Sequence, residues 1–263
     1  MSTVRNIAAY LEEVAPAVLA ESWDNVGLLV GDARRGVRRI MTCLTITPAS
    51  AAEAVAAAAE LIVTHHPLPF RPVRRLTTEN AAGRLLLELS AARIAVYSPH
   101  TAWDSAPQGI NQRLAEGLGL AEIAPLVLGP EGQGRGRRGQ LSRPLTLGRL
   151  AARLGKFLKL PRMHRVGRDG RLVRSVAVAC GAADELVEAA VTADCDAMVL
   201  GEARFHTCLE AEAAGMGLLL CGHFASERFA MKCLAGMLKK EFPKLDIWAS
   251  RKERDPLRWQ AEG

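Results

Sequence analysis

The sequence contains no apolar run near the roughly 20 residues that a membrane-spanning helix requires. Its longest alanine-rich run, Ala54 to Val63, is interrupted by Glu60. At the amino terminus, Val4, Ile7 and Leu11 have the spacing of an amphipathic helix, which differs from the continuous apolar core of a signal peptide. We therefore expect a cytoplasmic protein with no membrane partner.

Paired cysteines are also missing. The chain has six cysteines, none of them in a CxxC motif, and most lie in apolar segments typical of strands or helices. Such scattered cysteines indicate free, buried thiols in a reducing compartment rather than disulfides or a thiolate metal site.

Aromatic residues are scarce, at 5% of the chain, although the formal net charge is +6. Much of the positive excess falls between Arg135 and Arg174, where Phe157 is the one Phe, Tyr or Trp residue. A groove for single-stranded nucleic acid needs several aromatic side chains that stack on bases. The charge therefore indicates a solvated basic face, and nucleic acid is not the partner that we expect.

Short β-rich runs alternate with longer helical patterns from Arg38 onward, and this alternation is typical of α/β folds. Residues 38–46 and 61–66 are predicted strands, and a helix between them begins at Pro48. The same alternation returns in the second half of the chain. We predict two related α/β units with sheets packed against helices.

The predicted boundary lies in residues 129–144, which contain five glycines and four arginines and are expected to form a linker or an exposed hairpin. Residues 1–128 would then form the first unit and residues 145–263 the second. The last strand of the second unit could return to the first. Residues 251–263 are polar and are expected to form a mobile tail.

Four of the six histidines follow predicted strands. They are His65, His66, His100 and His223. The carboxyl ends of strands are where α/β sheets bind ligands. The adjacent pair stands directly before Pro67, where its strand ends, so that each ring could reach one of two metal ions about 3.5 to 4 Å apart. Taken alone, the pair could equally be part of a surface turn.

Two of these histidines are each followed four residues later by a carboxylate, Asp104 after His100 and Glu227 after His223. Residues four apart lie on one face of a helical turn. Helix capping would explain either carboxylate by itself. Together the segments offer nitrogen and oxygen donors that suit two ions of zinc, iron, manganese, nickel or cobalt. The predicted ligands are His65, His66, Asp104, His223 and Glu227, while His100 could ligate or orient.

A pair of divalent cations held by two carboxylates keeps a net positive charge, which attracts hydroxide and small anionic substrates such as nucleotides. Hydrolysis is then chemically accessible, with His100 and His206 as candidate proton carriers. The first predicted function is therefore a metal-dependent hydrolase. The alternative is a non-enzymatic metal-binding protein or metallochaperone that delivers iron, nickel or zinc through the same ligands.

The sequence resembles the Nif-three-like family over nearly its whole length. The motifs that carry the resemblance are SWDNVGLLVGD (22–32), IVTHHPLPF (62–70), YSPHTAWDSAPQGIN (97–111), GRGRRGQL (134–141), LGEARFH (200–206) and CGHFASE (221–227). Members of this family are commonly named GTP cyclohydrolase 1 type 2 homologues or dinuclear metal-centre proteins.

The resemblance implies that His65, Asp104 and Glu227 hold one metal, that His66 and His223 hold the other, and that Glu227 bridges the two. It further implies a Nif-three-like fold of two related α/β units with mixed sheets. A homo-oligomer, typically a hexameric ring with metal sites facing an inner cavity, is the implied assembly. The implied substrate is a nucleotide or another phosphate-bearing small molecule.

The sequence departs from the family pattern at three places. Phe205 stands where a histidine commonly precedes His206, and Thr45 stands where an aspartate is usual. The glycine-rich turn after one strand is reduced to residues 180–183, Cys-Gly-Ala-Ala. None of these departures removes a predicted ligand.

Four further residues are expected to lie outside the chemistry. Trp23 should pack, while Asp24 and Asn25 should satisfy a turn. His164 lies in a polar stretch and should be exposed and uninvolved.

Overall fold

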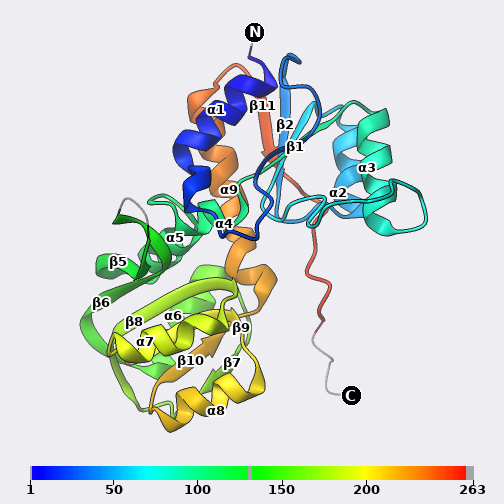
Figure 1. Ribbon diagram of the computed structural model, residues 1–263. Coiled ribbons are helices and arrows are strands. Elements are labelled where there is room, and N and C mark those ends of the chain that lie inside the picture. Colours follow the sequence, from blue (N-terminus) through cyan, green and yellow to red (C-terminus); the bar gives the residue numbers. More distant parts are fainter. Residues whose placement is uncertain (1, 130–131, 259–263) are drawn as a thin grey trace. The chain divides into compact units, whose positions relative to one another are not determined.

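The computed structural model describes residues 2–129 and 132–258, which form two compact units. Unit one comprises residues 2–11, 23–100 and 231–258, and unit two comprises residues 12–22, 101–129 and 132–230. Figure 1 traces the chain through both units. The main part of unit two begins near residue 101, and the chain returns to unit one near residue 231. This division differs from the predicted one at residues 129–144.

Unit one contains a five-stranded sheet. Its spatial order is β1 (Gly27–Val30), β4 (Ala95–Ser98), β3 (Leu61–Thr64), β2 (Arg39–Cys43) and β11 (Asp246–Ala249). The last four strands are parallel to one another, and β1 pairs with β4 in the antiparallel sense. Every residue of β3 and β4 is buried, as expected for parallel strands covered on both faces.

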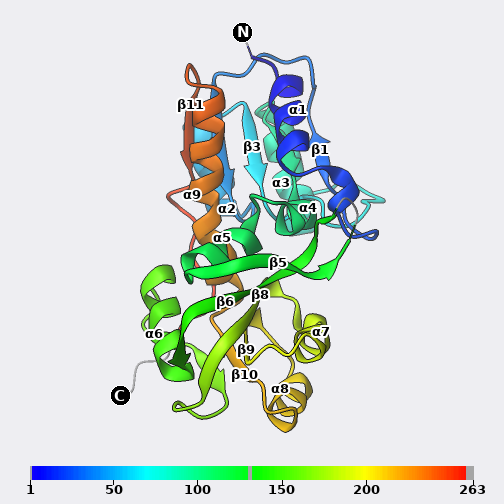
Figure 2. The ribbon, with the colours of Figure 1, turned by 90° about the vertical axis from the view of Figure 1, so that its left-hand side faces the viewer.

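Helices cover both faces of this sheet. Figures 1 and 2 show α2 (Pro48–Ala56) and α3 (Ala81–Ala91) on one face, and α1 (Val4–Val14) with α9 (His223–Glu241) on the other. Local sequence sets where α2 begins, since the Thr47 hydroxyl accepts the backbone N–H of Ser50 and the Ser50 hydroxyl accepts that of Thr47. Asn80 caps α3 in a similar way.

Unit two contains a six-stranded mixed sheet. Its spatial order is β5 (Leu120–Leu128), β6 (Gly134–Thr146), β8 (Leu172–Ala182), β9 (Ala197–Glu202), β10 (Gly217–Leu220) and β7 (His164–Val166). The central strands β8, β9 and β10 are parallel, whereas the other pairs are antiparallel. The carboxyl ends of these three parallel strands therefore meet at one edge.

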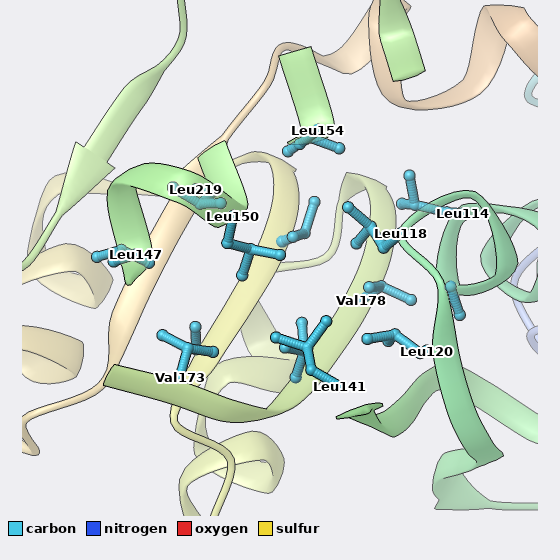
Figure 3. Packing of buried hydrophobic residues seen from close by; sticks show 14 of the residues in the cluster. Leu114, Leu118, Leu120, Leu141, Leu147, Leu150, Leu154, Val173, Val178 and Leu219 are labelled. Carbon is cyan, nitrogen blue, oxygen red and sulfur yellow. The ribbon is translucent and has the colours of Figure 1, made fainter. Parts of the chain in front are cut away.

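The helical elements of unit two are η1 (Ala17–Leu19), α4 (His100–Ser105), α5 (Ile110–Gly117), α6 (Leu147–Leu158), η3 (Asp184–Leu186), α7 (Val187–Thr192) and α8 (Phe205–Ala213). Figure 3 shows how Leu114 and Leu118 meet Leu150 and Leu154 over the sheet residue Val178. All five side chains are fully buried. Burying each one contributes about 1.5 to 3 kcal/mol. The mixed sheet of unit two is thus anchored by an apolar core.

The predicted linker is largely a strand. From Gly134 onward, β6 pairs with β5 on one side and with β8 on the other, while residues 130–131 lie outside the described residues. The composition of the segment did not indicate a strand, because arginines are usually found at the surface. Arg137, however, is 2% exposed and donates hydrogen bonds to backbone carbonyls. Gly136 has a φ of +61°, which glycine adopts without strain.

Part of the expected tail, residues 251–263, is also fixed. Glu253 is 7% exposed, and its Oε1 accepts hydrogen bonds from the backbone N–H groups of Leu44 at 2.6 Å and Thr45 at 2.9 Å. The buried carboxylate ties this segment to the end of β2. Residues 259–263 lie outside the described residues. Of the helices in the described ranges, none has both the length and the apolar composition that a membrane span requires.

Candidate metal centre

Three imidazoles lie together in unit one. His65 and His66 directly follow β3, and His100 lies two residues beyond β4. These neighbouring strands are parallel, so their carboxyl ends lie at the same edge of the sheet. The ring centroids of His65 are 5.1 Å from those of both His66 and His100, and His66 and His100 are 5.6 Å apart. Each residue offers a ring nitrogen within 4.8 Å of the others, so the group could hold a metal ion.

Two of these rings are oriented by oxygen atoms of other segments. The Nδ1 atom of His66 shares a hydrogen bond of 2.6 Å with the Thr45 hydroxyl, and Nδ1 of His100 donates to the Asp24 carboxylate at 2.7 Å. Thr45 thus orients His66 from the position where an aspartate is usual in the family. Histidines that bind metals typically make such a bond with the second ring nitrogen.

A second set of candidate ligands lies in unit two. His223 and Glu227 occupy the first turns of α9, which begins after the carboxyl end of β10. The Nε2 atom of His223 is 3.2 Å from Oε2 of Glu227, and its Nδ1 atom donates to Oε1 of Glu202 at 2.8 Å. The Glu227 carboxylate is buried, whereas Glu202 is exposed at the end of β9.

These two carboxylates change the acid–base behaviour of His223. The hydrogen bond that the His223 ring donates to Glu227 raises the pKa of His223 to about 9; burial opposes the change, and Glu202 adds to it. Without a metal, His223 is therefore protonated at neutral pH and lies between two carboxylates. A cation at Nε2 would replace one proton, while Glu202 would keep the other nitrogen in place.

The close packing around Glu227 requires glycine. A Cβ atom on Gly181, which has a φ of +64°, would lie 2.4 Å from Oε1 of Glu227. The backbone N–H of Gly181 donates to the Ser226 hydroxyl at 2.9 Å, and that hydroxyl donates to the His223 carbonyl at 2.7 Å. The segment at residues 180–183, which includes the end of β8, therefore keeps a glycine where Glu227 packs.

Asp104 belongs to the same unit. The Cys180 thiol donates a hydrogen bond of 3.2 Å to Oδ1 of Asp104. Asn111 donates to the Asp104 carbonyl at 3.2 Å and accepts from the backbone N–H of Cys180 at 2.7 Å. Burial raises the pKa of the Cys180 thiol well above its ordinary value, and the charges of Asp104 and Glu227 raise it further. The thiol therefore keeps its proton and acts as a donor to the carboxylate.

The segment after Asp104 is held by the buried guanidinium of Arg137. Its Nη2 donates to the carbonyls of Ser105 at 2.8 Å and Ala106 at 2.9 Å. Its Nη1 donates to the carbonyls of Gly134 and Gly136, both at 2.8 Å. Desolvation lowers the pKa of Arg137 from its ordinary high value. A single side chain of β6 thus fixes the end of α4, which carries Asp104.

The remaining predicted histidines lie elsewhere. His206 is an exposed residue in the first turn of α8, and its ring centroid is 5.8 Å from that of Phe205. His164 is exposed on β7, in agreement with the prediction.

Three residues of the site had no predicted role in its chemistry, namely Asp24, Cys180 and Glu202. Asp24 and Glu202 lie inside the motifs that carry the family resemblance, and this position was the signal that could have indicated a role for them. Asp24 is 76 residues from His100, and Glu202 is 21 residues from His223, so no local pattern reveals the pairing. Trp23, which was expected to pack, is 61% exposed.

The donor set of each unit fits a divalent cation. Imidazole nitrogens and carboxylate oxygens are the ligands that first-row transition metals take in proteins. The buried Glu227 carboxylate fits especially well, because a buried anion needs a positive partner. The fold and these residues define a class: α/β proteins with a buried histidine and glutamate group that could hold a metal ion beyond the ends of parallel strands.

A model of the family Duf34/NIF3 (NGG1p interacting factor 3) matches residues 2–256, and the chain belongs to this family. The resemblance seen in the sequence motifs is therefore confirmed. A GTP cyclohydrolase 1 type 2 homolog of Clostridium perfringens is 29% identical over 257 residues, which cover 97% of this chain and 98% of the relative. A Streptomyces coelicolor protein of the same name is 36% identical over 234 residues, which cover 86% of this chain and 82% of the relative.

Solved structures share the fold of this chain. The crystal structure of a Bacillus cereus protein related to NIF3 matches with a TM-score of 0.93 at 22% identity and covers 99% of both chains. A hypothetical protein of Staphylococcus aureus matches with a TM-score of 0.90 at 26% identity, covering 98% of this chain and 99% of that one. The predicted Nif-three-like α/β fold with mixed sheets is confirmed.

Proposed function

We propose that this chain is a dinuclear metal-binding protein that hydrolyses a nucleotide or another phosphate-bearing small molecule. The proposed ligands are His65, His66, Asp104, His223 and Glu227. Two divalent ions, of zinc, iron, manganese, nickel or cobalt, are the proposed cofactors. The names of the curated relatives agree with such an activity.

One observation carries the metal proposal. The Nδ1 atoms of His66, His100 and His223 are each bonded to a protein oxygen, from Thr45, Asp24 and Glu202 respectively. Such bonds select the ring orientation and leave Nε2 as the donor atom, which is the arrangement of histidines in metal sites. Rings oriented only by packing would not need three separate oxygen partners.

The residues of the chain supply binding, orientation and proton transfer. When bound, a pair of divalent cations supplies Lewis-acid polarisation of a phosphate or carbonyl oxygen and a lowered pKa of water. Asp24 accepts the Nδ1 proton of His100, so Nε2 of His100 is the atom that would accept or deliver a proton. We retain His206 as a second proposed proton carrier, although its exposed position on α8 makes it less suited than His100.

A second candidate function is metal delivery, and the exposure of one ligand favours it. The side chain of His223 is 37% exposed and that of its partner Glu202 is 54% exposed, whereas that of Glu227 is 4% exposed. A ligand at the solvent edge allows a metal to be exchanged with a chelator or a client protein. Retention of metal during turnover is the property that separates a hydrolase from a delivery protein.

Metal analysis of the purified protein tests the proposal directly. The wild type should carry up to two ions per chain, and Glu227→Gln and His65→Ala should each lower this number. His164→Ala is the control, because His164 is an exposed histidine of β7. Metal content that is equal in all four proteins would contradict the proposed ligands.

Turnover is tested separately with each loaded metal, on GTP and on a panel of phosphoesters. Hydrolysis that is lost in Glu227→Gln and kept in His164→Ala supports the hydrolase. Absence of turnover together with rapid transfer of metal to a chelator would favour the delivery function instead.

A further inference from the structure

Two exposed aromatic side chains of unit one flank the candidate metal ligands. Trp23 is 61% exposed and Phe70 is 48% exposed. Their ring centroids are 6.0 Å apart, and they lie 6.1 Å and 6.0 Å from the ring of His100. His100 in turn contacts the rings of His65 and His66. The two aromatic rings therefore lie directly beside the imidazole group.

Polar contacts join the two segments that carry these rings. The side-chain amide of Asn25 donates to the carbonyl of Pro69 at 2.8 Å, which joins the segment after Trp23 to the segment before Phe70. Asp24, which lies between Trp23 and Asn25 in the sequence, accepts a hydrogen bond from His100. The exposure of the rings is thus a feature of an ordered structure.

Exposure of large aromatic surface to water is unfavourable, and exposed apolar side chains that lie together often mark a binding site. The chain has 4 tryptophans and 6 phenylalanines among 263 residues, so placing two of them in solvent beside the imidazoles is a costly use of scarce residues. Tryptophan with one open face is a common stacking partner for planar rings, because the interaction depends on the π face and little on the substituents.

The geometry of the rings selects how such a ligand would bind. The planes of Trp23 and Phe70 are tilted by 44° with centroids 6.0 Å apart, so no second ring fits between them. A planar ring would therefore stack on one open face, chiefly that of the larger Trp23, and contact the edge of Phe70.

The charge next to the platform indicates an anionic ligand. Arg71, Arg74 and Arg75 follow Phe70, all three are exposed, and no acidic residue occurs between Phe70 and Thr78. Guanidinium groups bind phosphate and carboxylate oxygens in a bidentate manner. Aromatic faces beside such a loop match a ligand with a planar ring at one end and an anionic group at the other.

We propose that Trp23 and Phe70 form an aromatic platform that stacks the planar ring of an anionic small molecule beside the His65, His66 and His100 group. This inference rests on the proposed function, since it names the residues that would bind the ring of the substrate. It assigns a binding role to Trp23, for which the sequence predicted only packing.

Ligand titration tests the platform. Guanosine 5′-monophosphate carries a planar ring, and ribose 5-phosphate has the same phosphate without the ring. We expect Trp23→Ala to weaken binding of the nucleotide by about tenfold and to leave binding of the sugar phosphate unchanged. Phe70→Ala should give a smaller loss of the same kind. Trp248→Phe is the control, because Trp248 lies on β11 and its ring contacts Arg39.

The outcomes separate this inference from the proposed function. Metal content should be the same in wild type and Trp23→Ala, and titration of chelator-treated protein measures stacking without metal. Failure of metal binding with ring-dependent affinity intact would refute the metal centre and keep the platform. Equal affinity of wild type and Trp23→Ala for the nucleotide would overturn the platform. A loss of oligomeric mass in Trp23→Ala, without a ring-specific loss of affinity, would overturn it too, because Trp23 would then belong to an interface between copies.

Discussion

At the scale of single residues, the carboxylates of this protein act mainly through hydrogen bonds to groups that are distant in the sequence. Asp24 and Glu202 each hold an imidazole, and Glu253 holds the backbone before Thr45, which orients His66. The chemical groups that touch a ligand are thus supported by a second layer of residues. Support of this kind limits the rotation of each ring.

Glu53 provides a test at this scale. Burial would raise the pKa of Glu53, but hydrogen bonds from Ser250, from the backbone of Arg251 and from other donors outweigh burial, so its pKa lies below the ordinary value of 4.5. A carboxyl whose pKa is lowered by folding stabilises the fold above its unfolded pKa and loses this contribution as pH falls through the folded pKa.

We therefore expect Glu53→Gln to lower the free energy of unfolding at pH 7 and to have little effect once Glu53 is protonated, well below pH 4.5. Urea unfolding followed at both pH values measures the difference. Glu88→Gln, an exposed change on α3, should leave the pH dependence as in the wild type. A deficit of Glu53→Gln that persists unchanged into acid would refute the role of this carboxylate.

At the scale of elements, strands and helices with clear patterns were predicted well, and two strands without such a pattern were missed. The strand at residues 61–66 corresponds to β3, and the helix expected to begin at Pro48 corresponds to α2. The strand β1 was not predicted, because its four residues begin at Gly27 and are followed by Gly31, and both glycines have positive φ. The strand β6 was taken for a linker, since a buried arginine breaks the usual alternation of apolar and polar residues.

Arg137 of β6 gives the prediction at this scale. Its guanidinium donates to four carbonyls and, through Nε, to Oε1 of Gln112 at 3.1 Å. Arg137→Met would leave buried carbonyls without these donors, so we expect a loss of about 3 kcal/mol in the free energy of unfolding. Arg138→Met, an exposed change at the next position, should alter stability by less than about 0.5 kcal/mol.

Chemical denaturation of both variants measures these effects. Because Arg137 also holds the end of α4, the metal affinity of Arg137→Lys should fall below that of Arg138→Lys even where both proteins are folded. Equal stability and equal metal affinity of the two arginine variants would show that Arg137 does not position Asp104.

At the scale of the whole molecule, the chain is built from two units, and each has candidate metal ligands beyond the carboxyl ends of parallel strands. The continuous helix α9 carries His223 and Glu227 in unit two and continues into unit one, where the carbonyl of Met231 accepts a hydrogen bond of 2.8 Å from Thr42 of β2. The last strand, β11, pairs with β2. The last strand of the chain thus belongs to the sheet of unit one. The sequence had indicated this only as a possibility.

Assembly is the prediction that belongs to this scale. The family resemblance implies a hexameric ring, and the 28.3 kDa chain should then give a particle of six times that mass. Mass photometry or light scattering at several protein concentrations measures it. A monomer at all concentrations, with metal content unchanged, would show that the site does not depend on a ring.

The sequence by itself determined the class of fold, the family and the five proposed ligands, because apolar periodicity and short motifs are local properties of the chain. Tertiary structure alone decided that Asp24, Thr45 and Glu202 orient the imidazoles, that Arg137 is buried, and that Trp23 is exposed beside His100. These facts depend on contacts between segments that are far apart along the chain. Such contacts form only when strands align in register and bring their carboxyl ends to one edge.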